Sequence, residues 1–418
     1  MNYQQTVQAL YALGNEMRSM KLGLDDIRQL AAALGDPQNS YDVVHVAGTN
    51  GKGSVCAMID SGLRAAGRRS GMFTSPHLIE PTERIQIDGR PVSESEFIRA
   101  FDAVHSAAEE LQLANHPTYF ETIATMALWL FRERGVEVAV VEVGLGGRLD
   151  ATNIVQPKLC VITPVDFDHE DVLGHSLAEI ATEKAGIIKN GVPVVVSRQA
   201  PEAMQAIRKR AEEAGSQLLP AADLFPVRDL QIDARGCSFS GTRCPLAGEH
   251  QVDNAVTAIV ALQQLGVDPT GISETRWPGR LEIVAPNPDV ILDGAHNPSG
   301  TAALARYLQT HYSHRRIWLI FGVLEDKAVR EMAEPLFPLA HQLVFTAPSN
   351  ERRLPPEKLL EIADGHVEPN LEEAIAWVTQ QITEGGEPPD RDAIVVAGSL
   401  YLVGEARKLY LHPTGGRW

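Results

Sequence analysis

A glycine-rich run with a single lysine is the part of this chain whose residue types most clearly suggest chemistry. The run Gly48-Thr49-Asn50-Gly51-Lys52-Gly53-Ser54 follows the apolar, β-branched stretch 43–46 and precedes a helix-compatible segment, 55–66. Glycines let the backbone approach a polyphosphate, backbone N–H groups point at the anion, and the helix dipole adds a favourable field. Lys52 would reach the outer phosphates, and the hydroxyl of Ser54 or Thr49 would face a magnesium ion.

The spacing of this loop departs from the common phosphate-binding pattern G-x-x-x-x-G-K-[ST]. Val46 stands where that pattern has its first glycine, and Gly53 separates Lys52 from Ser54. A plain Gly/Asn turn between a strand and a helix is therefore the alternative. Because a strand precedes the loop and a helix follows it, we favour phosphate binding.

Carboxylates and one histidine follow two further apolar runs. Glu142 lies near the end of the run 138–143, and the acidic cluster 166–171, which contains His169, follows the run 159–163. A carboxylate at the end of a buried strand is costly unless it is paired or metal-bound, so a structural ion pair is the alternative for Glu142. The ligand types suit Mg²⁺ better than zinc, which prefers more Cys or His ligands.

The elements that must position these residues alternate between strand and helix. Over residues 41–215 this alternation predicts a doubly wound α/β domain, in which ligands bind beyond the carboxyl ends of the strands. Residues 227–250 resemble short strands of a small antiparallel subsheet. After the proline-rich stretch 285–288, strands at 290–292, 317–322, 342–346 and 393–397 predict a smaller, Rossmann-like α/β domain. We therefore expect two domains, 1–284 and 285–418.

Composition excludes several classes of protein. The net charge of −17 over 418 residues argues against nucleic-acid or anionic-membrane binding. The four cysteines lack metal-ligand spacing and are typical of reduced thiols. The N-terminus has no signal-peptide pattern, and no apolar run approaches the roughly 18 residues of a membrane span. We expect a cytoplasmic monomer.

Several strings along the chain, in a consistent order, resemble the Mur-ligase superfamily, and most closely its folylpolyglutamate synthase/dihydrofolate synthase branch. They are HVAGTNGKGS (45–54), FTSPHL (73–78), TYFE (118–121), VEVGLGGRLDATN (141–153), DHEDVLG (168–174), EKAGIIK (183–189), HQVDNA (250–255), WPGRLE (277–282) and DGAHNP (293–298). The resemblance covers residues 45–298, and LGL (22–24) extends it toward the N-terminus. Beyond residue 298 only the predicted architecture matches.

The resemblance implies an ATP-dependent amide ligase of the bifunctional bacterial type. ATP would phosphorylate a substrate carboxylate, and the amine of L-glutamate would attack the acyl phosphate. The substrates would be 7,8-dihydropteroate and reduced folates. A monofunctional folylpolyglutamate synthase is the alternative within the class. A peptidoglycan-type Mur ligase is more distant, because residues before 41 leave no room for its nucleotide-sugar domain. A regulatory nucleotide-binding module without catalysis is the alternative from another class.

The resemblance also assigns residues for ATP, metal and catalysis. Lys52, His169 and Lys184 would be catalytic, and Mg²⁺, as two ions with ATP, would bind through Ser75, Glu142, His169 and Lys184. Lys184 matches a lysine that these ligases carry as a carbamate, and an ion pair with Glu183 or Glu179 is the alternative. ATP would contact Asn50, Gly51, Lys52, Gly53, Ser54, Asn254, Arg280 and Asp293. For Arg280 and Asp293, which flank the predicted domain boundary, surface salt bridges are the alternative.

The pterin and glutamate sites are implied in the same way. Residues matching the pterin site are Leu22, Gly23, Leu24, Thr118, Phe120, Glu121, Asp150 and Ala151, and His296 would lie near glutamate. Tyr119 or Phe120 offers an aromatic face for stacking, but either ring could instead belong to the core.

Overall fold

The computed structural model describes residues 1–14, 23–112 and 116–411. They form two compact units that alternate along part of the chain. The first unit comprises residues 1–229, 239–244 and 253–275, and the second comprises 230–238, 245–252 and the segment from residue 276 onward. The two domains predicted from the sequence, 1–284 and 285–418, stay a prediction.

The first unit is built on a sheet whose order is β4-β3-β2-β5-β1-β6-β7-β8. Strands β2, β5, β1, β6, β7 and β8 run parallel, and β3 and β4 extend one edge with antiparallel pairing. The strands are β1 (Asp42–Ala47), β2 (Ser70–Phe73), β3 (Ile85–Ile87), β4 (Arg90–Pro91), β5 (Val138–Glu142), β6 (Leu159–Ile162), β7 (Val194–Val196) and β8 (Leu218–Pro220).

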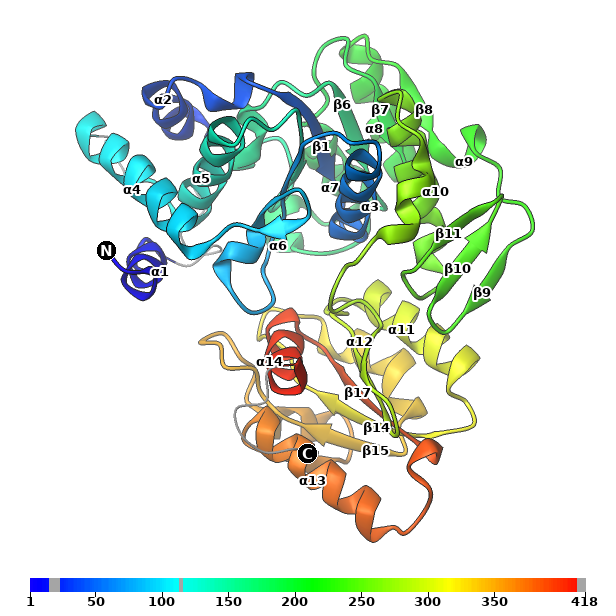
Figure 1. Cartoon of the computed structure of the whole chain (residues 1–418). Coiled ribbons are helices and arrows are strands. Elements are labelled where there is room, and N and C mark those ends of the chain that lie inside the picture. Colours follow the sequence, from blue (N-terminus) through cyan, green and yellow to red (C-terminus); the bar gives the residue numbers. More distant parts are fainter. Residues whose placement is uncertain (15–22, 113–115, 412–418) are drawn as a thin grey trace. The chain divides into compact units, whose positions relative to one another are not determined.

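Helices cover both faces of this sheet, as in a doubly wound fold (Figure 1). The helices up to residue 264 are α1 (Tyr3–Ala12), α2 (Asp25–Ala33), α3 (Lys52–Ala65), α4 (Glu94–Leu111), α5 (Tyr119–Glu133), α6 (Glu170–Leu173), α7 (Leu177–Ala185), α8 (Pro201–Glu213), α9 (Ala221–Leu224) and α10 (His250–Gln264). After β1 the chain crosses toward β2 on one side, and β6 lies on the other side. The carboxyl end of β1 is therefore the topological switch point, where such folds bind ligands.

The hydrophobic core follows the alternation of side chains along the strands. On one face, Val43 and Val141 pack in a cluster with Phe101 of α4 and Phe131 of α5. A second cluster on that face joins Ala47 of β1 to β6, β7, α7 and α8. Val44 and Val46 are fully buried and point to the opposite face, where α3 contacts β2 and β5. The strands are buried on both sides, which explains their nearly continuous apolar sequence.

A small antiparallel sheet follows, in the order β11-β10-β9. Its strands are β9 (Gln231–Asp233), β10 (Gly236–Phe239) and β11 (Thr242–Cys244). The predicted subsheet over 227–250 is confirmed.

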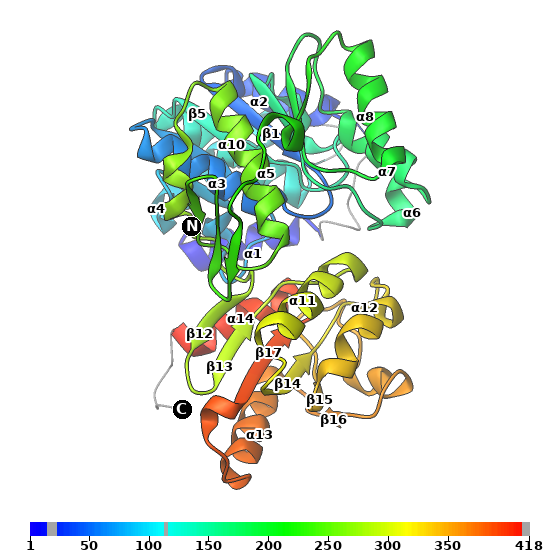
Figure 2. The ribbon, with the colours of Figure 1, turned by 90° about the vertical axis from the view of Figure 1, so that its right-hand side faces the viewer.

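The second unit contains a sheet of order β12-β13-β17-β14-β15-β16, which can be followed in Figure 2. Only β12 is antiparallel to its neighbour. Strands β12 (Glu282–Ala285), β13 (Asp289–Leu292), β14 (Arg316–Phe321), β15 (Gln342–Phe345), β16 (His366–Val367) and β17 (Asp392–Ala397) combine with helices α11 (Pro298–His311), α12 (Val329–Leu336), α13 (Leu371–Glu384) and α14 (Leu400–Leu411). The predicted class, a doubly wound α/β domain and a smaller α/β domain, is confirmed.

Two local differences from the sequence expectations bear on function. The helix after the glycine loop begins at Lys52 rather than Val55, so Lys52, Gly53 and Ser54 form its first turn. Strand β12 occupies residues that we expected only to mark a boundary, because its pairing with β13 comes from a hairpin that the local sequence does not reveal.

Within the described residues, all four cysteines are buried thiols. None of the described helices has the length and apolar character to cross a membrane.

Candidate active site

The predicted phosphate loop, residues 48–54, lies at the carboxyl end of β1 and continues directly into α3. Gly51 is the residue before the helix, and its φ of 84° lies in the left-handed region that favours glycine. A β-carbon at this position would collide with the side-chain amide of Asn254 on α10. The close approach of Gly51 and Asn254 brings together two residues predicted to contact ATP, although they are far apart in sequence.

The loop is anchored to the segment that follows β6. The backbone N–H groups of Thr49 and Asn50 donate to the carbonyl oxygen of Pro164 at 2.9 and 3.2 Å. The Thr49 hydroxyl donates to the carbonyl oxygen of Asp166 at 3.0 Å and accepts from the Asp166 N–H at 3.0 Å. The phosphate loop and the acidic segment 166–171 are thus fixed to each other at adjacent strand ends. The Thr49 hydroxyl therefore holds the loop to the backbone of Asp166.

Two lysines converge on this loop from different helices. Nζ of Lys52 donates to the carbonyl oxygen of Thr49 at 3.1 Å, and Nζ of Lys184, on α7, donates to the carbonyl oxygen of Gly48 at 3.0 Å. Glu183, one alternative partner for Lys184, instead pairs with Arg148 at 3.0 Å. The Lys184 side chain is therefore directed toward the phosphate loop.

Burial suppresses the charge of Lys184. The residue is 4% exposed, and burial lowers its pKa to about 7, assisted by the positive charge of Lys52. The carboxylates of Asp168 and Asp150 act in the opposite direction but are smaller effects. A substantial fraction of Lys184 is thus a neutral amine near neutral pH, and a neutral amine is nucleophilic.

Glu142 and Ser75 meet at the carboxyl ends of β5 and β2. The Ser75 N–H donates to Oε2 of Glu142 at 3.1 Å, and Glu142 is 4% exposed. The carboxylate also raises the pKa of the Cys56 thiol on α3, although burial is the larger cause of that shift. Glu142 is therefore a buried carboxylate next to the helix that begins with Lys52.

His169 precedes α6 in a left-handed backbone conformation, with a φ of 52°. Its N–H donates to Oδ1 of Asp168 at 3.0 Å, and its Nε2 lies 3.7 Å from the same oxygen. Asp168 therefore holds the backbone N–H of His169 and lies near its ring. The sequence cluster contained Asp168, but we did not single it out as a site residue.

The donor set at these strand ends fits magnesium. Ser75 and Glu142 offer oxygen atoms, which magnesium prefers, and His169 offers an imidazole nitrogen. An ammonium group on Lys184 would repel the ion, whereas a lysine carbamate would add two oxygen ligands. The lowered pKa of Lys184 is the observation that agrees with the carbamate.

The segment expected at the pterin site has clear structural roles in the first unit. Thr118 caps α5: its hydroxyl accepts from the Glu121 N–H at 3.2 Å, and Oε2 of Glu121 accepts from the Thr118 N–H at 2.8 Å. Tyr119 is buried and stacks on Tyr11 with a ring distance of 5.6 Å. Phe120 is only half-buried, at 5.9 Å from the ring of Phe73. Phe120 is thus the more accessible of the two aromatic rings.

Asp150 organises the loop after β5. Its carboxylate accepts from the N–H groups of Leu145 and Thr152, each at 2.9 Å, and burial raises its pKa. The Thr152 hydroxyl also contacts Asp150 and lies 2.9 Å from Nε2 of His45 on β1. His45 is fully buried, and this burial lowers its pKa to about 3, so the ring is neutral. Sequence reasoning missed His45 because it lies inside an apolar strand.

Ala151, Leu24 and Gly23, three further residues expected at the pterin site, also belong to the first unit. Ala151 is buried beside Asp150, and Leu24 is buried in the same core as α5. Gly23 precedes α2 with a φ of 153°. Leu22 lies outside the described residues.

Arg280, Asp293 and His296 form a separate group within the second unit. The Asp293 carboxylate accepts from the N–H groups of Leu281 at 2.9 Å and Ala295 at 3.0 Å. Burial raises the Asp293 pKa even though the Arg280 guanidinium acts to lower it. Nδ1 of His296 lies 2.7 Å from the carbonyl oxygen of Gly294 and, as the donor, leaves Nε2 as the basic nitrogen.

Two family models match the chain. The Mur ligase middle domain matches residues 46–262, and the Mur ligase glutamate ligase domain matches residues 279–400. These matches contain the phosphate loop, both lysines, the acidic strand ends and the Arg280–His296 group. The fold and the site together define a Mur ligase.

Comparison with individual proteins shows to which branch of the Mur ligases the chain belongs. Dihydrofolate synthase/folylpolyglutamate synthase of Bacillus subtilis is 34% identical over 414 residues, which cover 93% of this chain and 95% of the relative. Folylpolyglutamate synthase of Mycobacterium tuberculosis complexed with ADP matches with a TM-score of 0.92 at 34% identity over 98% of both chains. FolC of Escherichia coli in complex with DHPP and ADP matches with a TM-score of 0.86 at 30% identity, over 98% of this chain and 97% of that one. The chain belongs to the dihydrofolate synthase/folylpolyglutamate synthase family of Mur ligases.

Proposed function

We propose that this protein is an ATP-dependent amide ligase that adds L-glutamate to 7,8-dihydropteroate, giving dihydrofolate, and to reduced folates, giving folylpolyglutamates. The observation that carries the proposal is the convergence of Lys52 and Lys184 on a glycine loop at the switch point of the sheet. Relatives named for both activities and a relative solved with DHPP and ADP support the choice of substrates.

The reaction divides into two transfers. A carboxylate oxygen of the pteroate or folate attacks the γ-phosphorus of ATP, which breaks the bond to ADP and gives an acyl phosphate. The amine of glutamate then attacks the acyl carbon, and the resulting tetrahedral intermediate expels phosphate and loses a proton to form the amide. The protein contributes positioning and electrostatic stabilisation, because no covalent bond to the enzyme is needed.

The phosphate loop would bind the nucleotide. The backbone of residues 50–54 lies at the N-terminus of α3, where N–H groups and the helix dipole favour an anion. Lys52 would stabilise negative charge on the transferred phosphoryl group. Asn254 contacts the same loop, which supports a role at the nucleotide. We also assign Arg280 and Asp293 to ATP, on the resemblance of their motifs to those of the family.

Ser75, Glu142 and His169, with Lys184 as a carbamate, would hold Mg²⁺, which when bound neutralises phosphate charge. The neutral Nζ of Lys184 would attack CO₂, forming an N–C bond and releasing one proton. The pKa of about 7 supports this step, because an ordinary lysine is almost fully protonated at neutral pH.

We assign the pterin to the segments that contain Gly23, Leu24, Thr118, Phe120, Glu121, Asp150 and Ala151, together with Leu22. The exposed part of Phe120 supports stacking against a flat ring. His296 would lie near the glutamate substrate, and its basic Nε2 supports contact with the incoming amine or its proton.

The experiment measures phosphate release from ATP with Mg²⁺ and L-glutamate, separately with dihydropteroate and with tetrahydrofolate, and identifies the products by mass. We expect a glutamylated product from each. Product with tetrahydrofolate alone would identify a monofunctional folylpolyglutamate synthase. Absence of product with both would overturn the proposed function.

We further propose that the protein acts as a monomer in the cytoplasm on these small molecules, without nucleic acid or membrane. Four buried thiols support a reducing compartment. Sedimentation equilibrium at micromolar concentration should give the mass of one chain, and a dimer mass would contradict the monomer.

A further inference from the structure

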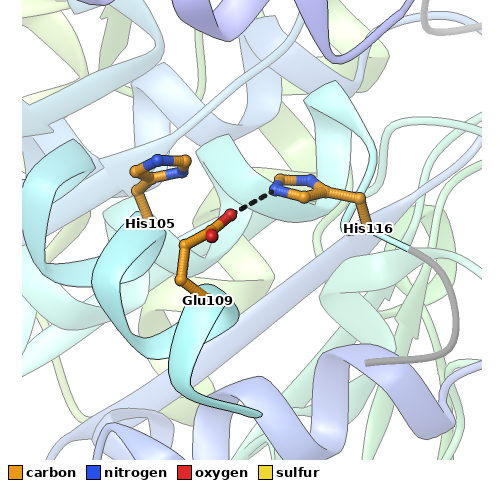
Figure 3. A group of neighbouring side chains, drawn as sticks. All are labelled: His105, Glu109 and His116. Atoms are coloured by element: carbon orange, nitrogen blue, oxygen red, sulfur yellow. Dashed lines mark ion pairs between the residues drawn. The ribbon is translucent and has the colours of Figure 1, made fainter. Parts of the chain in front are cut away.

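Three side chains of metal-binding type lie together on the first unit, outside the proposed ligase site (Figure 3). His105 and Glu109 are separated by four residues on α4, so they share one face of that helix. His116 comes from the segment just before α5. His105 is half-buried, and Glu109 and His116 are exposed, so solvent can deliver an ion to all three.

The distances among these groups are close to those that one ion requires. One ligand atom of each residue lies within 4.8 Å of the other two. Nε2 of His116 lies 3.6 Å from Oε1 of Glu109. Ligands at about 2.1 Å in a tetrahedral zinc site are about 3.4 Å apart, so the His116–Glu109 edge needs almost no adjustment.

Neighbouring groups orient both imidazole rings. The ring of His105 stacks on Phe101 at 5.4 Å with an interplanar angle of 12°, and Phe101 is itself buried. Nδ1 of His116 lies 3.1 Å from the carbonyl oxygen of Pro117. A hydrogen bond from Nδ1 to that carbonyl would make Nε2, the nitrogen that lies 3.6 Å from Glu109, the one that carries the lone pair. Such a backbone partner is the usual support for a metal-binding histidine.

We propose that His105, Glu109 and His116 form a site for a divalent transition-metal ion of the zinc class. Two imidazoles and one carboxylate are a common zinc ligand set, and solvent would complete the coordination. Magnesium is disfavoured, because it prefers oxygen ligands.

An ion at this site would connect α4 to the beginning of α5. His116 lies two residues before Thr118, the N-cap of α5, and Phe120 is in the first turn of that helix. Metal binding would therefore fix the position of the segment that leads into α5. Because the ion binds the folded chain, it should also raise the melting temperature.

The test uses the full chain after removal of metal with EDTA. Mg²⁺ and ADP are added in excess to occupy the proposed ligase site, and Zn²⁺ is then titrated by equilibrium dialysis with elemental analysis. Co²⁺ is titrated in parallel, because its visible absorption reports tetrahedral nitrogen and oxygen coordination. We expect one ion per chain at micromolar concentration, intense Co²⁺ bands, and a higher melting temperature with Zn²⁺.

Variants locate the ion. His105→Ala, Glu109→Gln and His116→Ala should each weaken Zn²⁺ binding roughly tenfold or more, by analogy with the loss seen when supporting groups of metal sites are removed. His314→Ala removes an exposed histidine of the second unit and should bind Zn²⁺ like the unchanged chain. Circular dichroism verifies that each variant is folded.

Two results would overturn the proposal. One is the absence of bound Zn²⁺ at micromolar concentration in the unchanged chain. The other is binding that survives in His105→Ala and His116→Ala but is lost in His169→Ala, since this pattern would place the ion at the ligase site.

Discussion

Lys184 illustrates how one buried residue acquires unusual chemistry. A lysine in water is charged at neutral pH, but this side chain is 4% exposed and lies near the charge of Lys52. Both conditions penalise the ammonium form. The hydrogen bond to the Gly48 carbonyl holds Nζ next to the phosphate loop, where we propose that the neutral amine reacts with CO₂.

Replacing Lys184 tests the carbamate directly. Lys184→Ala should lower kcat roughly a thousandfold, comparable with the removal of a strong electrostatic group from an active site, while the far-UV spectrum is unchanged. Added bicarbonate should not restore activity, because no amine remains. A short carboxylic acid that occupies the vacant space should restore part of it. Near-normal turnover of the variant would exclude the carbamate role.

The pH dependence of stability gives a second test of Lys184. Its folded-state pKa of about 7 is below the unfolded value of 10.5, so the unfolded chain binds more protons between these pH values. Stability from this residue therefore rises with pH from about 7 toward 10, by a few kcal/mol in total, and is lowest below pH 7.

Urea unfolding in CO₂-free buffer at pH about 7 and about 9.5 measures this effect. Lys184→Met should show a smaller rise in unfolding free energy than the unchanged chain. Lys209→Met, which removes an exposed lysine of α8, should retain the full rise. An equal rise in the chain with Lys184→Met would contradict the lowered pKa.

At the scale of elements, the site exists because parallel strands end at one edge of a sheet. The ends of β1, β2, β5 and β6 present the phosphate loop, Ser75, Glu142 and the acidic segment. The sequence predicted this gathering, because continuous apolar runs indicate parallel strands and chemically active residues follow each run.

Other features of the site could not be predicted from local sequence. The proximity of Asn254 to Gly51 depends on how α10 packs. The hydrogen bond between His45 and Thr152 depends on the turn that places Thr152 beside the ring. The carboxylate of Asp168 accepts from the His169 N–H and acts to raise the pKa of Lys184, but in the sequence it was only one of several acids. Long-range packing selects among such candidates, and residue type alone does not.

The turn from β1 into α3 allows a test of the phosphate loop. Gly51→Ala introduces a β-carbon at a φ of 84° that also collides with Asn254. We expect the affinity for ADP to fall roughly tenfold or more, because each 1.4 kcal/mol of distortion is a factor of ten. Isothermal titration with ADP measures the change.

Gly67→Ala is the matched control. Gly67 has a similar φ of 73°, but a β-carbon there would meet no atom within 4 Å. This variant carries the backbone strain, about 1–2 kcal/mol, without the collision. Its ADP affinity should equal that of the unchanged chain. If both variants lost affinity equally, general destabilisation would explain the effect and the local argument would be wrong.

At the scale of the whole molecule, the two units are not consecutive stretches of chain. Residues 230–238 and 245–252 belong to the second unit, although they precede residue 276. The Tyr307 hydroxyl of α11, for example, donates to the carbonyl oxygen of Ala234 at 2.8 Å. The sequence predicts a single boundary, which the stretch 277–282 and the proline-rich stretch 285–288 mark, and it does not reveal that earlier residues belong to the second unit.

Two fragments test where the C-terminal segment of the second unit begins. The fragment 276–418 retains β12, whereas 285–418 loses nearly all of it and exposes β13 as an edge strand. The shorter fragment also loses buried Leu281, whose N–H donates to Asp293, and the ion pair of Glu282 with Arg407 at 3.1 Å. A buried carboxylate left without its donor and an exposed edge both oppose folding and favour association.

We therefore expect 276–418 to unfold cooperatively as a monomer, and 285–418 to melt roughly 10 °C or more below it and to associate. The estimate combines the lost burial of Leu281 with the lost hydrogen bond of Asp293, a few kcal/mol in a small domain. Circular dichroism melts and sedimentation velocity measure both properties. Equal melting temperatures and monomeric behaviour would instead support a domain boundary at residues 284 and 285. In that case residues 276–284, which include most of β12, would add little to the stability of the second unit and would serve only as a connection.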